Sequence, residues 1–122
     1  MRPAPGDIVY AYRKPKPPSR RRFSLRLGLQ HPVLRLNPMS VTDEHGHDWI
    51  EVLPVPRGVL DTHLDPDAVV LIPVLDVASY KETLTPEVLH VVLQVLETGK
   101  PPWPTLREAL QRGDHGGPRP AN

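Results

Sequence analysis

The sequence predicts a mostly β domain, a small barrel with helices near its C-terminal end. Short apolar runs recur along the chain, turn residues separate them, and 17 of the 122 residues are proline. Average proline usage of about 5% would give roughly six, and this density disfavours long helices. Several short strands followed by one late helix are typical of a small barrel whose open end the helix covers.

The first predicted strands flank a basic run. Residues 8–12 are β-branched and aromatic, as strands prefer, and residues 23–27 alternate apolar and polar side chains. Between them lies the basic run, residues 13–22, which repels itself and is predicted to be a loop. Residues 31–36 form the next strand, with Asn37-Pro38 as its predicted end.

A hairpin and an apolar strand follow. Residues 40–43 and 49–53 flank an acidic segment centred on Gly46, which is a hairpin pattern. Residues 68–72 form the most apolar strand, and we expect it at the centre of the sheet.

Two helices are predicted next. Thr85 is an N-cap with Pro86 at the first helical position, and Gly99 ends this helix. Its apolar stripe consists of Val88, Leu89, Val92, Leu93, Val95 and Leu96. Val91 and Val95 widen the stripe, which predicts that part of it meets a second subunit. Thr105 and Glu108 form a capping box for a second helix over 106–112. Residues 1–113 are predicted as one domain and 114–122 as a frayed tail.

Composition excludes several classes of protein. The chain has no cysteine, which rules out disulfide scaffolds and thiol nucleophiles. No segment approaches the roughly 20 apolar residues that a membrane span requires. The first residues lack the apolar stretch of a signal peptide, so we expect a cytoplasmic protein with no membrane association.

The net charge of +1 conceals a strong asymmetry. Residues 1–37 carry +8, residues 38–97 carry −9 and the last 25 residues carry +2. Such a chain either folds its two halves against each other or offers a basic surface to a polyanion such as nucleic acid. The candidate phosphate contacts are Arg13, Lys14, Lys16, Arg20, Arg21, Arg22, Arg26 and Arg35.

Three stretches resemble the MazF/PemK family of toxins. Pro5-Gly6-Asp7-Ile8-Val9 is similar to the family's first strand, and His31-Pro32 stands where the family has Arg-Pro before an apolar strand. Residues 64–71 with 84–89 resemble its last strand, linker and helix. The resemblance implies an SH3-like barrel, a homodimer, an antitoxin partner and an endoribonuclease that cuts single-stranded RNA without a metal or cofactor.

The sequence departs from the family pattern at the catalytic positions. His31 replaces the arginine that stabilises phosphate charge, and Pro54-Val55-Pro56 offers no hydroxyl where the family has Ser or Thr. One preorganised donor is worth about 3–4 kcal/mol of transition-state stabilisation. If the protein cuts RNA, His31 is the candidate acid, base or charge stabiliser, and Arg20 to Arg22 hold the phosphates.

Three other interpretations stay open. The same barrel could be a non-catalytic module that binds RNA, DNA or a protein through the basic run, or a regulator that binds protein through its acidic half. Tyr10 and Tyr12 share a strand face, as a base-stacking platform or as packing residues. The segment 43–48, with His45 and His47, is a polar turn by default; a metal site would need a fixed third ligand.

Overall fold

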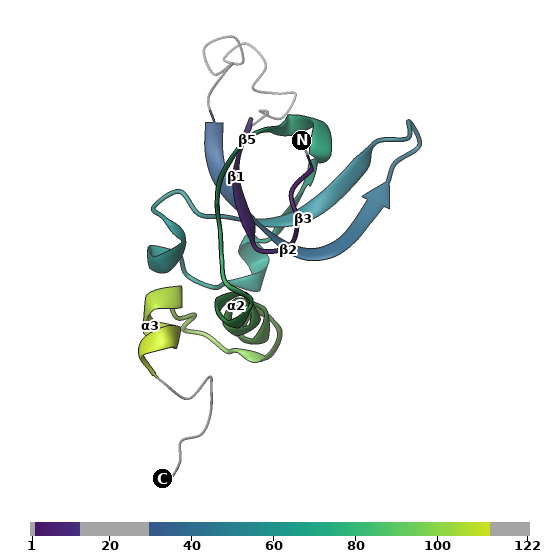
Figure 1. The fold of residues 1–122 in the computed structure, drawn as a ribbon. Coiled ribbons are helices and arrows are strands. Elements are labelled where there is room, and N and C mark those ends of the chain that lie inside the picture. Colours follow the sequence, from purple (N-terminus) through teal and green to yellow (C-terminus); the bar gives the residue numbers. More distant parts are fainter. Residues whose placement is uncertain (1, 13–29, 113–122) are drawn as a thin grey trace, which may run out of the picture.

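A computed structural model describes residues 2–12 and 30–112 as a five-stranded antiparallel sheet followed by two helices (Figure 1). The strands are β1 (Asp7–Tyr12), β2 (Gln30–Thr42), β3 (Asp48–Pro54), β4 (Val70–Pro73) and β5 (Val77–Thr83). The helices are α2 (Pro86–Thr98) and α3 (Leu106–Gln111), with 3-10 turns η2 (Val59–Asp61), η3 (Pro66–Ala68) and η4 (Val74–Asp76). The predicted strand 23–27, the basic run and the tail 114–122 lie outside the described residues. Within the described part, neither helix has the length and apolar character to cross a membrane.

The sheet is curled but is not closed into the predicted barrel. Its strand order is β4-β3-β2-β1-β5, so β4 and β5 are the two edges and do not pair with each other. In a flat sheet these edges would lie about 19 Å apart. Only η4 joins them, and the four backbone steps from Pro73 to Val77 span at most about 15 Å. The sheet therefore bends back on itself and leaves an opening between its edges.

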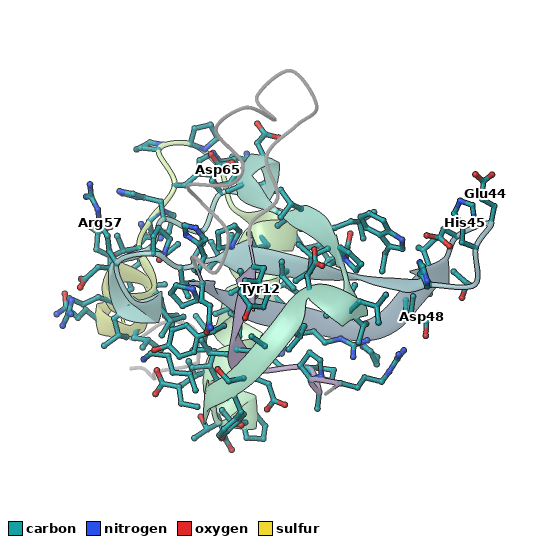
Figure 2. All side chains as sticks on the ribbon, turned by 90° about the horizontal axis from the view of Figure 1, so that it is seen from above. Tyr12, Glu44, His45, Asp48, Arg57 and Asp65 are labelled. Carbon is teal, nitrogen blue, oxygen red and sulfur yellow. The ribbon has the colours of Figure 1, made fainter. Side chains whose placement is uncertain are left out.

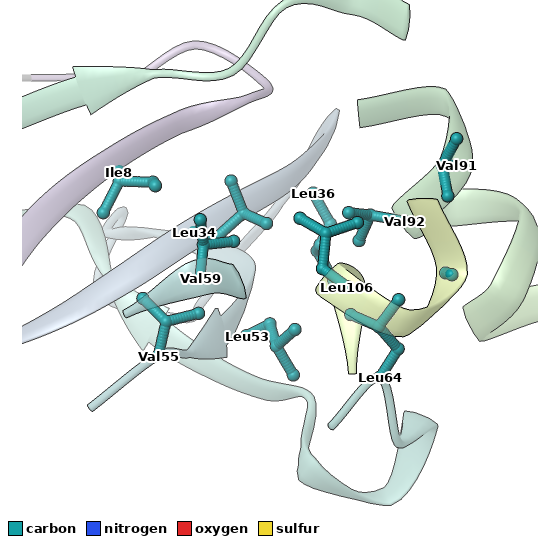
Figure 3. Close-up of a cluster of buried hydrophobic side chains, with 11 residues drawn as sticks. Ile8, Leu34, Leu36, Leu53, Val55, Val59, Leu64, Val91, Val92 and Leu106 are labelled. Carbon is teal, nitrogen blue, oxygen red and sulfur yellow. The ribbon is translucent and has the colours of Figure 1, made fainter. Parts of the chain in front are cut away.

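Apolar side chains fill both faces of the central strands. Neighbours such as Val33 and Leu34 point to opposite faces, and each is buried in a different cluster. The cluster on the convex face lies under α2 and α3 (Figure 3) and includes Ile8, Leu34, Leu53, Val92 and Leu106. The cluster inside the curl consists of Val9, Ala11, Val33, Ile50, Val52 and Val77. Two buried faces explain the continuous apolar runs in β1, β2 and β3.

The predicted hairpin is confirmed, but its first strand is longer than expected. β2 runs through Asn37-Pro38, where the sequence predicted an end, to Thr42. The pairing of β2 with β3 shifts register between Arg35 and Ser40. Pro38 lies in this irregular stretch, so its missing N–H breaks no regular ladder bond.

The most apolar predicted strand lies at an edge of the sheet, not at its centre. Among the described strands β4 pairs only with β3, and residues 66–68 form η3, so the strand starts at Val70 and not at residue 68. The position of an apolar strand in a sheet depends on the strands that flank it, and the composition of the strand itself does not determine those neighbours.

The sequence analysis did not predict β5. It pairs with β1 across 76 residues of chain, from Asp7 to Thr83.

Both predicted helices are confirmed together with their caps. The Thr85 side chain accepts from the Val88 N–H, and Thr105 forms a capping box with Glu108. The stripe on α2 is taken up by the core: Val91 is 4% exposed, and Val95 packs against the same cluster. Val91 is therefore covered within the chain, and the expectation that part of the stripe meets a second subunit stays a prediction.

Candidate functional site

A cavity of about 250 Å³ opens at the mouth of the curled sheet, where four strands begin or end. β1 and β3 end there, and β2 and β4 begin there. We call it the mouth pocket; its walls are Ala11, Tyr12, His31, Pro32, Val33, Pro54, Pro56, Val70 and Ile72. These residues include no carboxylate, lysine or arginine. The part of the wall that the structure describes is therefore apolar, and one imidazole and one phenol are the polar side-chain groups in it.

His31 brings the single imidazole to the mouth pocket. It is the second residue of β2, pairs with Ala11 of β1 and is half-buried in the pocket wall. In the described part of the chain its ring has no hydrogen-bond or ion-pair partner. No described residue thus occupies either ring nitrogen, and each can act as donor or acceptor according to protonation state.

Tyr12 contributes the aromatic surface. Its side chain is 41% exposed and lines the mouth pocket, whereas Tyr10 does not. The predicted pair of tyrosines is therefore replaced by one tyrosine facing a wall of prolines, Pro54 and Pro56 among them. A shallow apolar pocket with one aromatic face accepts a flat ring such as a nucleobase, since every base has a π-face for stacking.

The basic run is attached to the chain at this rim. Tyr12 is the last residue of β1, pairs with Gln30 of β2, and precedes Arg13 in the sequence. Arg13, Lys14, Lys16, Arg20, Arg21, Arg22 and Arg26 lie outside the described residues, so the structure does not place them. Their segment nevertheless leaves the sheet at Tyr12 and returns at Gln30, beside His31.

Arg35 has a structural role. Its side chain is buried, and its Nε and two terminal nitrogens donate to the backbone carbonyls of Asn37, Pro3 and Met39. Burial lowers the pKa of the guanidinium below its ordinary value. These bonds tie the N-terminal segment and the irregular part of β2 together. We therefore leave Arg35 out of the phosphate-binding residues proposed below.

The histidines of the hairpin tip do not form a metal centre. Figure 2 shows Glu44, His45 and Asp48 far from Tyr12, at the end of the projecting β2–β3 hairpin. Asp43 organises the turn: one carboxylate oxygen accepts from the N–H groups of His45 and His47, and the other accepts from Trp49 Nε1 at 2.8 Å. Across the described residues, no group of three or more His, Asp or Glu side chains could hold a metal ion.

His63 and His90 lie away from the mouth pocket. His63 Nδ1 lies 2.8 Å from the carbonyl oxygen of Trp103, and His63 bridges to Thr105, so it joins the chain before η3 to the start of α3. His90 is on the exposed side of α2.

Sequence reasoning found His31 and Tyr12 but missed most of the wall around them. The missed wall residues come from β3, β4 and the loop between them; they are Pro54, Pro56, Val70 and Ile72.

Comparison with protein-family models, curated protein sequences and solved structures finds no match to this chain.

Proposed function

We propose that this protein binds single-stranded RNA at the mouth pocket and cuts it there in the manner of the MazF/PemK family, without a metal or other cofactor. The observation that carries the proposal is an imidazole in an apolar pocket, without a partner among the described residues, at the point where a segment with seven lysines and arginines (residues 13–29) joins the sheet. A base would stack against Tyr12, and its phosphates would meet Arg20, Arg21 and Arg22. The curled, open sheet supports the finer proposal of a half-open SH3-like barrel.

The proposed cleavage needs only acid–base chemistry on the RNA. The ribose 2′-hydroxyl loses its proton and attacks the adjacent phosphorus, the bond from phosphorus to the 5′-oxygen breaks, and that oxygen gains a proton. The products are a 2′,3′-cyclic phosphate and a 5′-hydroxyl. Neutral His31 can accept the first proton, and protonated His31 can donate the second. A homodimer and an antitoxin that occupies the mouth pocket belong to the same proposal.

A second candidate function is a non-catalytic module that binds single-stranded nucleic acid. It is favoured by the described walls of the mouth pocket, whose residues include one imidazole and no arginine or second imidazole. Prolines stand where a serine or threonine hydroxyl would assist the reaction. Such a pocket would hold a base by stacking and leave the backbone intact.

The deciding experiment incubates a long RNA of mixed sequence with the purified protein and excess chelator, followed by a denaturing gel. We expect discrete fragments whose new 5′ ends are hydroxyls, which polynucleotide kinase labels without prior phosphatase treatment. His31→Ala should slow cleavage by about 10²–10⁴-fold, the usual contribution of one acid or base. His90→Ala, on the exposed side of α2, is the matched control and should cut normally.

RNA that stays intact at high protein concentration would overturn the cleavage proposal. Fluorescence anisotropy with the same RNA then tests the second candidate, for which Tyr12→Ala should weaken binding and His90→Ala should not. An RNA that neither changes length nor binds would exclude both functions.

A further inference from the structure

A second cavity, of about 240 Å³, lies between α2, α3 and the segment 99–105 that joins them. We call it the helix pocket. Its floor is apolar and comes from Val91 and Val95 of α2, Ala109 of α3 and Pro104 between the helices. Val91, Pro104 and Ala109 are buried, so the floor is part of the packed interior of the protein.

The helix pocket lies away from the mouth pocket, and no residue lines both. α2 packs beside the beginning of β1, since a Cβ on Gly6 would lie 3.4 Å from Leu89 Cδ2. The mouth pocket is at Tyr12, the other end of β1, and a strand of six residues spans roughly 17 Å. In Figure 1 the helices lie at one end of the molecule, and β1 ends and β2 begins at the other.

Lys100 and Arg112 are exposed cations on the rim of the helix pocket. The described residues hold thirteen carboxylates and seven lysines and arginines, a net charge of −6. Of the seven bases, Arg35 donates to backbone carbonyls and three others pair with carboxylates, namely Arg2, Lys81 and Arg107. Arg57, Lys100 and Arg112 have no hydrogen bond or ion pair within the described part of the chain. Two of these three cations line the helix pocket, and none of its described lining residues is a carboxylate.

The two cations stand beside the C-terminal ends of the helices. Lys100 follows the end of α2, and Arg112 follows the end of α3. The last carbonyl groups of a helix carry a partial negative charge, about half a unit for a long helix. That charge offsets part of the two positive charges, so the helix pocket favours an anion of one negative charge over an anion of two.

The walls of the helix pocket are fixed before any ligand binds. Residues 99–105 include three prolines, whose backbone has little freedom. Gly99 is packed so closely that a Cβ there would lie 2.6 Å from the Val95 carbonyl oxygen and 3.3 Å from Trp103 Cζ3. A preformed pocket loses little conformational entropy when it takes up a ligand.

We propose that the helix pocket binds a small organic acid, with an apolar body of about one six-membered ring and a single carboxylate. The ring would lie on the apolar floor. The planar guanidinium of Arg112 can donate two parallel hydrogen bonds to a carboxylate, and the Lys100 ammonium adds a second positive charge. An apolar cavity of about 150 Å³ holds benzene, so the helix pocket has room for a ring with its carboxylate. The proposal is independent of the RNA chemistry at the mouth pocket.

The test is a titration of the ¹⁵N-labelled full chain with sodium benzoate, against sodium chloride at equal ionic strength, followed by amide NMR. We expect shifts at residues 94–100 and 109–112 and a Kd of about 1 mM, typical of a ligand of this size. Benzyl alcohol has the same ring without the charge and should bind more weakly. Phenyl phosphate should bind no more tightly than benzoate, and tighter binding would overturn the assignment of a carboxylate.

Three variants locate the charge contact. Arg112→Gln and Lys100→Gln should each raise the Kd for benzoate about three- to tenfold. Arg57→Gln removes the third unpaired cation, which does not line the helix pocket, and should leave the Kd unchanged. In the double variant of Arg112 and Lys100, benzoate and benzyl alcohol should bind alike. Circular dichroism verifies that all variants are folded.

Two results would overturn the proposal. The first is the absence of shifts around the helix pocket at about 20 mM benzoate, well above the expected Kd. The second is a double variant that binds benzoate as the wild type does. In either case Lys100 and Arg112 would serve only to balance the charge of the helix ends. Neither result bears on RNA, because the titration contains none.

Discussion

Arg35 shows how a single residue can connect segments that the sequence keeps apart. Its guanidinium donates to the carbonyls of Pro3, Asn37 and Met39, and its own carbonyl accepts from the Gly6 N–H at 2.8 Å. The N-terminal segment is thereby held against β2. A buried cation that donates to three carbonyls is a fixed structural element, because removal of the donors leaves those acceptors unsatisfied.

We therefore predict that Arg35→Met destabilises the protein by about 1–3 kcal/mol, because the apolar side chain fills the space but leaves the buried Pro3 carbonyl and two part-buried carbonyls without this donor. Urea unfolding followed by circular dichroism measures the change. Arg57→Met is the control, since Arg57 is exposed and surface substitutions usually change stability by about 0.5 kcal/mol or less. Equal stability of the two variants would show that the Arg35 hydrogen bonds contribute nothing net.

At the scale of the element, the β2–β3 hairpin depends on carboxylates near its tip. Hydrogen bonds from the Trp49 indole and from the His47 and His45 backbone hold the pKa of Asp43 below its ordinary value. Hydrogen bonds from Thr42 and Arg2 do the same for Asp48. The tip beyond Trp49 has no β4 partner, so these bonds replace sheet pairing there.

The hairpin tip should lose order in acid. A carboxylate whose pKa is depressed in the folded state stabilises that state above its unfolded pKa, about 3.9 for aspartate. That stabilisation disappears as the pH falls through the lower, folded pKa. We expect the Trp49 indole N–H resonance to shift and its protection from exchange, relative to the intrinsic rate at each pH, to fall below about pH 4, while amides of β1 stay protected. Asp43→Asn should produce the same loosening at neutral pH. A tip whose protection relative to the intrinsic rate is the same from pH 7 to 2.5 would contradict this.

Elements with local signals could be predicted from the sequence. The caps of α2 and α3 lie within three residues of the N–H groups that they satisfy, and the hairpin turn is organised by Asp43 through residues two to six positions away. Strand position depends on partners elsewhere in the chain. β4 is the most apolar strand and still lies at an edge, and β5 is polar and still pairs along β1.

The same distinction applies to the candidate site. His31 stood out because it replaces an arginine of the family pattern, and Tyr12 because it shares a strand face with Tyr10 next to the basic run. Val70 and Ile72 are ordinary apolar residues about 40 positions further on, and the curl of the sheet alone brings them to the mouth pocket. A wall built from the ends of four strands has no signature in any one segment.

At the scale of the whole molecule, charge is divided between two parts of the chain. The described residues carry a net charge of −6, and residues 13–29 contain seven bases and no acid. RNA binding should therefore depend strongly on salt. For a single strand, each phosphate contact adds about 0.7 to the slope of log K against log salt.

Replacing Arg20, Arg21 and Arg22 together with glutamine should reduce that slope by about 2, since three contacts are lost. Fluorescence anisotropy with a single-stranded RNA between about 50 and 500 mM salt, a tenfold range, measures it. The control replaces Lys81 and Arg107, two cations that are paired with carboxylates, and should leave the slope unchanged. An unchanged slope in the triple variant would show that phosphates bind elsewhere.

The position of β1 has a consequence for how the protein is made. β1 is synthesised before β5, and the pairing of the two strands joins Asp7 to Thr83. On the ribosome, one side of β1 must remain without its partner until β5 has emerged, and α2 and α3, which cover the convex core, come later still. Until then the nascent chain carries an apolar strand with an open edge, and association with other chains or with chaperones competes with folding. Slower synthesis of the segment between β1 and β5 would prolong this exposure.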